Sequence, residues 1–161
     1  MSFEEAEEIV CREGADILFS EEMKRTERLI QHGSTSVFEH CRNVACQSLI
    51  IADYFHCAVD ERAMVRGALL HDYFLYDWHT PNEGHSLHGF RHAKIALRNA
   101  ERDFQLGRVE RDVIRKHMFP LNITPPRYRE SLIVSLADKI CAVGEMRAER
   151  EARKRVKITH F

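Results

Sequence analysis

The sequence lacks an excess of charge of either sign and a long apolar run. Its 24 lysine and arginine residues balance 25 aspartate and glutamate residues. A net charge of −1 therefore provides no general surface for a nucleic-acid polymer or an anionic membrane. No apolar run approaches the length of a membrane span, and the N-terminal MSFEEAEEIV is acidic where a signal peptide is basic and apolar. We therefore expect a cytoplasmic protein with neither of these partners.

Paired cysteines are also missing. The five cysteines are odd in number and none lies in a C-x-x-C motif: Cys11, Cys41, Cys46, Cys57 and Cys141. Most of them fall in segments with helical periodicity. We interpret them as reduced, small hydrophobic residues, which excludes both a disulfide framework and a cysteine zinc site.

Neither sustained alternation of apolar and polar residues nor an internal repeat is present, so the sequence does not predict a β-sheet protein or a solenoid. Apolar residues instead recur at steps of three and four, which predicts an all-α protein. The 161 residues suit a single domain with one core. We predict a helical bundle of about six or seven helices that spans residues 1–161.

Capping residues and turn signals set the expected helix boundaries. Ser2 with Glu5 has the spacing of a capping box, Ser20 and Asp60 suit helix N-caps, and the GSTS segment that ends at Ser36 offers further caps. The expected helices cover about residues 3–18, 21–33, 37–56, 61–72, 90–104 and 109–119, and a last helix begins near residue 127.

Three parts of the chain are expected within this single domain. N-terminal helices cover residues 1–33, the core covers about 36–145 and a basic helical extension covers 146–161. Ile133, Leu136, Ile140 and Val143 are expected on one apolar face of the last helix. The extension is expected to be either a solvated helix end or a contact in a homo-oligomer.

Ten histidines are the unusual feature of the composition, and the most informative of them lies in RGALLHDYFLYDWH. There His71 and Asp72 follow the apolar Ala68, Leu69 and Leu70 directly. Burying an imidazole and a carboxylate costs several kcal/mol unless each has a partner or a metal. Polar side chains interrupt apolar helical faces at six positions in all: His40, His71, Asp72, His92, His117 and Asp138.

These six residues lie on different predicted helices, apart from the adjacent pair. Inward-facing side chains from several helices are how a bundle builds a metal site. Imidazole and carboxylate groups suit Fe, Mn, Zn, Ni, Co or Mg, and six of them exceed the needs of one tetrahedral ion. We therefore predict two divalent ions, with Asp72 able to serve both.

The order of these residues resembles the HD-domain superfamily of metal-dependent phosphohydrolases, an all-α family. HCRNVA, GALLHD and LADKI are similar to its ligand segments, and the resemblance covers about residues 37–143. HAKIAL and IRKHM are similar to the two extra ligand segments of its dinuclear branch. The resemblance implies one metal on His40, His71, Asp72 and Asp138. It implies a second metal on His92 and His117, with Asp72 as the bridge.

The sequence departs from the family after the pair, where many members continue HDIGK. Here Tyr73, Phe74 and Leu75 follow, so a phosphate-binding cation has to come from elsewhere. Arg42, Lys94, Lys116 and Lys139 lie near ligand positions in the sequence. Arg42 and Lys139 are the candidates for stabilising an anionic transition state, and Asp77 is a candidate proton-transfer carboxylate.

Three assignments have alternatives. His88 lies four residues before His92 and could share its helical face, although Ile95 and Leu97 favour His92. His117 could instead cap the end of its helix. Lys139 could be a salt-bridge partner rather than a phosphate contact.

The main hypothesis is a metal-dependent phosphohydrolase that acts on a small phosphorylated compound, with a nucleotide as the first choice, by metal-activated water. Residues 73–88 lack helical periodicity and are expected to form the mouth of the site. Two other classes stay open. One is a di-iron oxygenase of the dinuclear branch, and the other is a non-catalytic module that binds a nucleotide.

Overall fold

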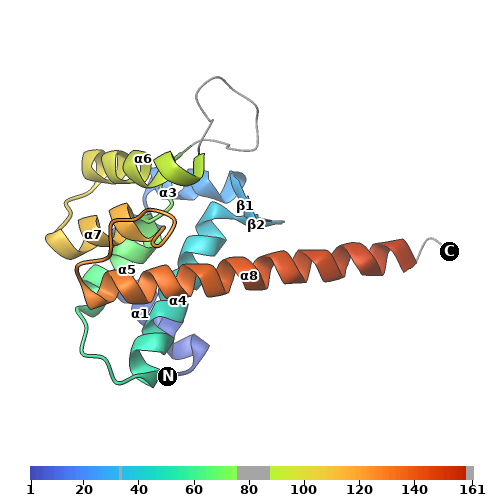
Figure 1. Ribbon diagram of the computed structural model, residues 1–161, viewed down its shortest axis with the longest axis horizontal. Helices are drawn as coiled ribbons and strands as arrows, with labels where there is room; N and C mark the ends of the chain where they lie inside the picture. Colours follow the sequence, from blue (N-terminus) through green and yellow to red (C-terminus); the bar gives the residue numbers. More distant parts are fainter. Residues whose placement is uncertain (33, 76–87, 159–161) are drawn as a thin grey trace.

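The computed structural model describes residues 1–32, 34–75 and 88–158, which fold into α-helices and one short antiparallel pair of strands (Figure 1). This arrangement confirms the all-α prediction. The elements in chain order are α1 (Phe3–Glu13), α2 (Ala15–Leu18), α3 (Glu21–Arg25), the 3-10 turn η1 (Thr26–Arg28), β1 (Ile30–His32), β2 (Thr35–Ser36), α4 (Val37–Tyr54), α5 (Glu61–Leu70), α6 (His88–Asp103), α7 (Arg108–Lys116) and α8 (Arg129–Ile158).

Side-chain caps begin the helices where the sequence predicts them. Ser2 and Glu5 form a capping box at α1, and Ser36 and Glu39 form another at α4. The Asp60 carboxylate accepts a hydrogen bond from the backbone N–H of Ala63 at 2.9 Å and caps α5. Each cap satisfies an N–H that has no partner within the helix, so short polar motifs are enough to fix these boundaries.

The expected helix between Ser20 and Gly33 is wrong in its second half. Helix α3 ends at Arg25, and β1 pairs with β2 so that Ile30 lies opposite Ser36. The chain has to reverse here before it enters α4, and the backbone N–H of Val37 donates to the carbonyl of Leu29 at 2.8 Å. The Leu29 carbonyl thus accepts a hydrogen bond from across the reversal, whereas in a continuous helix it would accept one from within the helix.

The first predicted helix is also divided, at Gly14, into α1 and α2. A Cβ atom at Gly14 would lie 2.3 Å from the Cδ1 atom of Leu69 on α5. The missing side chain therefore lets the N-terminal helices approach α5 closely.

Helix α4 is central to the bundle and packs against α1, α5 and α8. Helix α7 packs against α5, α6 and α8. Buried side chains from these elements form one continuous core that includes Val44, Leu69, Ile114 and Val134. Among the described residues, no helix is both long and apolar enough to cross a membrane.

Helix α8 runs along the bundle with its first half and projects beyond it with its second half (Figure 1). The four apolar residues expected on one face of α8 differ in their burial. Ile133 is buried, but Leu136, Ile140 and Val143 are 47%, 47% and 43% exposed. Beside Ile133 and Val134, the buried side of the helix carries small and polar residues, among them Ala137 and Asp138. The homo-oligomer and the division of the chain into a core and two extensions stay predictions.

The crossing of α5 and α7 depends on Gly67, because a Cβ atom there would lie 2.8 Å from the Cβ of the buried Val113. We expect Gly67→Ala to lower the free energy of unfolding by up to about 2 kcal/mol. Overpacking costs about 1–3 kcal/mol, and the better helix propensity of alanine offsets about 1 kcal/mol of this cost. Urea denaturation of the full chain measures the change.

Gly144→Ala is the matched control, since a Cβ atom at Gly144 on α8 meets nothing within 4 Å. This variant should be as stable as the wild type or more stable, by up to about 1 kcal/mol. Equal stability of the two variants would contradict the close crossing of α5 and α7.

Candidate metal centre

His71 ends helix α5 and is completely buried. Its Nδ1 donates a hydrogen bond to the carbonyl of Ala68 at 2.7 Å. A carbonyl can only accept, so Nδ1 carries the proton and Nε2 is left as the nitrogen that can bind a metal. Nε2 lies 3.4 Å from Oδ2 of Asp72 and 3.7 Å from Oδ1 of Asp138.

His117 occupies the same position at the end of α7. Its Nδ1 lies 2.9 Å from the carbonyl of Ile114, and its Nε2 lies 3.5 Å from Oδ1 of Asp72. The two interpretations of His117 are therefore compatible, because the residue ends its helix and also directs Nε2 inward. Helix α6 brings His92 to the same place, with its Nε2 at 3.3 Å from Oδ1 of Asp72 and 2.9 Å from Nε2 of His117.

His40 and Asp138 close the opposite side of the cluster. His40 is fully buried in α4, and its Nε2 lies 3.2 Å from Oδ1 of Asp138 on α8. Its Nδ1 lies 3.1 and 3.0 Å from the two carboxylate oxygens of Glu145. The structure thus brings together all six side chains proposed as metal ligands, from α4, α6, α8 and the ends of α5 and α7.

Asp72 lies between two groups of ligands. One group consists of His40, His71 and Asp72, the other of Asp72, His92 and His117, and in each the potential ligand atoms lie within 4.8 Å of one another. Oδ2 of Asp72 faces His71, whereas Oδ1 faces His92 and His117. The two oxygens of one carboxylate are therefore directed to different histidines.

The unsatisfied atoms of the centre fit divalent cations. Within the described part of the chain, the buried His71 Nε2 and Asp72 Oδ1 have no hydrogen-bond partner. Leaving such atoms unsatisfied is costly, and a metal ion would satisfy both. Imidazole and carboxylate ligands suit zinc, iron and manganese.

Burial and neighbouring charges give the histidines of the centre different pKa values. Burial, with the nearby His71 and His92, lowers the pKa of His117 to about 3, so this ring is neutral at neutral pH. Burial also opposes charge on His40, but hydrogen bonds to Asp138 and Glu145 raise its pKa to about 10. Burial raises the pKa of Asp72 but His71 and His92 together hold it well below its usual value, so this carboxylate is ionised.

The two candidate cations are engaged with protein partners. The Arg42 guanidinium lies 3.3 Å from Glu7 of α1, and its buried Nε has no hydrogen-bond partner among the described residues. Lys139 donates to the carbonyls of His117 and Ser135 at 3.1 and 3.0 Å, and its pKa is lowered by burial. A phosphate-binding role for Arg42 or Lys139 stays a prediction.

The other residues near the pair are placed only in part. Lys116 pairs with Asp112 at 2.7 Å, and Lys94 is exposed on α6. Asp77 and most of the expected mouth, residues 76–87, lie outside the described residues, as does the side chain of His88. Tyr73 and Phe74, the first residues of the expected mouth, are buried in the core.

The sequence interpretation missed two side chains that contact the centre. Gln31 of β1 donates from Nε2 to Oδ2 of Asp72, and its own Oε1 is buried without a hydrogen-bond partner among the described residues. No sequence signal marks Gln31, because this segment was expected to be helical. Glu145 could have been found, since it follows Asp138 by seven residues, or two turns of one helix.

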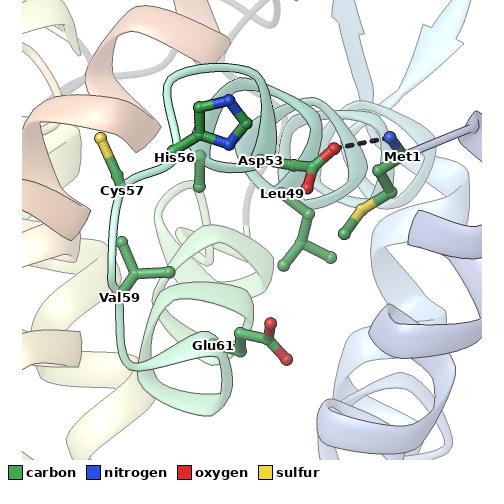
Figure 2. A pocket seen from close by; sticks show the side chains of 8 residues that line it. Met1, Leu49, Asp53, His56, Cys57, Val59 and Glu61 are labelled. Carbon is green, nitrogen blue, oxygen red and sulfur yellow. Dashed lines mark hydrogen bonds and ion pairs between the residues drawn. The ribbon is translucent and has the colours of Figure 1, made fainter.

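A small surface pocket of about 150 Å³ lies elsewhere, near the end of α4 (Figure 2). It is lined by Met1, Leu49, Ala52, Asp53, His56, Cys57, Val59 and Glu61. The N-terminal amine pairs with Asp53 at 2.6 Å, as the dashed line in Figure 2 shows. None of the six clustered residues lines this pocket, so it is separate from the centre.

Metal binding at the centre should strengthen as the pH rises. The pKa of His40 is about 10, so at neutral pH a metal ion has to displace a proton from this ring. A higher pH removes this competition. We expect the apparent affinity of the metal-free protein for Mn²⁺ to rise about tenfold per pH unit for each proton displaced, between about pH 6 and about pH 8.

Competition with a chelator of known affinity measures this pH dependence. His56→Ala is the control, because His56 lies in the surface pocket and the variant should show the wild-type slope. An affinity that stays constant over this range would contradict the displacement of protons at the centre.

The family model of the HD domain matches residues 37–143. No curated protein and no solved structure matches the chain. The matched region begins with α4 and contains all six clustered residues, and it covers well over half of the sequence. The arrangement of these residues on α4, α6 and α8 and at the ends of α5 and α7 agrees with the family match, and the chain belongs to the HD domain family.

Proposed function

We propose that the protein is a metal-dependent phosphohydrolase that acts on a small phosphorylated compound, and within that class on a nucleotide. Family membership indicates metal-dependent hydrolase chemistry. The observation that supports a dinuclear centre is the Asp72 carboxylate, whose two oxygens face different groups of histidines. The nucleotide is proposed by analogy with the family.

His40, His71, Asp72 and Asp138 would hold one ion, and His92 and His117 with Asp72 would hold the other. When bound, divalent ions lower the pKa of a coordinated water toward neutrality and neutralise charge on phosphoryl oxygens. The protein contributes orientation. The carbonyls of Ala68 and Ile114 fix the rings of His71 and His117, and the Gln31 amide holds one oxygen of Asp72.

A hydrolase also needs groups that move protons and bind anionic oxygens. We propose Asp77 for proton transfer, and Arg42 and Lys139 as the cations that stabilise negative charge in the transition state. Lys139 would have to exchange a carbonyl partner for the substrate. Arg42 would have to leave Glu7, a pair in which both side chains are partly exposed and which is therefore weak.

Two other functions remain alternatives. A di-iron oxygenase would use the same six ligands but would consume oxygen. A module that binds a nucleotide without turnover would keep the fold and hydrolyse nothing. The complete set of six clustered residues favours an enzyme over such a module.

Asp72→Ala should abolish hydrolysis and lower the metal content, because it removes the carboxylate shared by both ligand groups. The wild type should carry more than one equivalent of divalent metal per chain, and the variant should carry less. Elemental analysis measures the metal content, and phosphate release measures hydrolysis. Asp53→Ala is the matched control, since Asp53 pairs with the N-terminal amine on the surface. Retention of most of the hydrolytic activity by Asp72→Ala would overturn the assignment.

A substrate screen tests the reaction class. Nucleoside mono-, di- and triphosphates, dinucleoside polyphosphates and simple phosphate esters are incubated with the Mn²⁺-, Fe²⁺- or Co²⁺-loaded protein. We expect phosphate-bond cleavage in at least one class. No cleavage with any metal, together with oxygen consumption in the presence of an organic substrate, would establish the oxygenase alternative instead.

A further inference from the structure

His40 differs from His71 and His117 in the position of its ring on its helix. His71 and His117 end their helices, where the last carbonyls have no helical partner and can accept from Nδ1. His40 lies in the first turn of α4, where the preceding carbonyls already accept helical hydrogen bonds. The Nδ1 of His40 therefore needs an acceptor from another part of the chain.

Glu145 on α8 supplies this acceptor. Its two carboxylate oxygens lie 3.1 and 3.0 Å from Nδ1 of His40, and its side chain is only 10% exposed. Asp138, two turns earlier on α8, lies 3.2 Å from the opposite nitrogen, Nε2. A single helix thus presents a carboxylate to each nitrogen of the same ring.

We infer that Glu145 is a positioning residue of the metal centre. By accepting a hydrogen bond from Nδ1, its carboxylate would keep the proton of a metal-bound His40 on Nδ1, and it directs Nε2 toward Asp138 and the interior of the cluster. Carboxylates that hold the outer nitrogen of a ligating histidine orient the ring and increase its basicity. This inference rests on the metal centre of the proposed function but not on the substrate.

The contact is unlike an ordinary helix-surface ion pair. Glu149, one turn further along α8, pairs with Arg153, whose side chain is 76% exposed. Such surface pairs contribute little because water and salt screen them. Glu145 instead meets a ring that is completely buried, and hydrogen bonds to charged groups are strongest where water is excluded. Removal of the Glu145 carboxylate should therefore affect the centre, whereas removal of the Glu149 carboxylate should not.

The test measures the affinity of the full, metal-free chain for Mn²⁺ by chelator competition. Glu145→Ala should bind about tenfold to a hundredfold more weakly than the wild type. Glu145→Gln should lose less, because its amide oxygen can still accept from Nδ1. Glu149→Ala, the matched control on the same helix, should bind like the wild type. Wild-type affinity in a folded Glu145→Ala variant would overturn the inference and leave the phosphohydrolase proposal intact.

A double-mutant cycle separates positioning from a direct effect on the metal. In a His40→Ala background, Glu145→Ala should cause no further loss of affinity, because the two residues act through one contact. A full, additive loss would overturn the inference, since Glu145 would then act independently of His40. If Glu145→Ala binds metal more weakly but the wild type hydrolyses no phosphorylated compound, the positioning role of Glu145 is supported and the proposed phosphohydrolase reaction is rejected.

Nitrogen-15 NMR of the wild type gives a result that does not depend on whether any variant folds. In the Zn²⁺-loaded protein, we expect His40 to carry its proton on Nδ1. A proton on Nε2 would overturn the inference. A wild-type chain that binds neither Mn²⁺ nor Zn²⁺ would overturn both the inference and the metal centre.

Discussion

The carboxylate of Asp72 imposes the main constraint on this structure. It is almost completely buried and ionised, and an unpaired charge of this kind costs several kcal/mol. The fold offsets part of this cost with His71 beside one oxygen and His92 beside the other, and these two histidines lower the pKa of Asp72. The neutral His117 directs an unprotonated Nε2 at the same oxygen as His92. Helix α6 and the ends of α5 and α7 therefore pack so that their histidines meet at Asp72.

The ends of two helices fix the orientation of two of the clustered histidines. The helices α5 and α7 each end on a histidine whose Nδ1 donates to the carbonyl three residues before it. A helix C-terminus leaves carbonyls without partners, so the same hydrogen bond completes the helix and fixes the ring. The close crossing of α5 and α7 at Gly67 then sets the distance between the two rings, whose centroids lie 4.8 Å apart.

Residues just outside the matched HD region complete the surroundings of the centre. Gln31 precedes residue 37 and contacts Asp72, and Glu145 follows residue 143 and contacts His40. The small sheet carries the first, and the continuation of α8 beyond Asp138 carries the second. The N-terminal segment and the part of α8 beyond Asp138 thus contact the cluster, and the six clustered residues alone do not describe its surroundings.

The sequence by itself determined the all-α class, most helix starts and the order of the six clustered residues, because caps, turns and apolar spacing act over a few residues. It failed for residues 26–32, where the need to reverse into α4 overrides local helical periodicity. It did not determine how far α8 buries its apolar residues, and Leu136, Ile140 and Val143 are about half exposed. Only the tertiary structure decided which nitrogens of His71, His92 and His117 face Asp72, and that Gln31 contacts Asp72 and Glu145 contacts His40. Contacts between residues about forty to a hundred positions apart depend on how helices pack, and no local pattern encodes that packing.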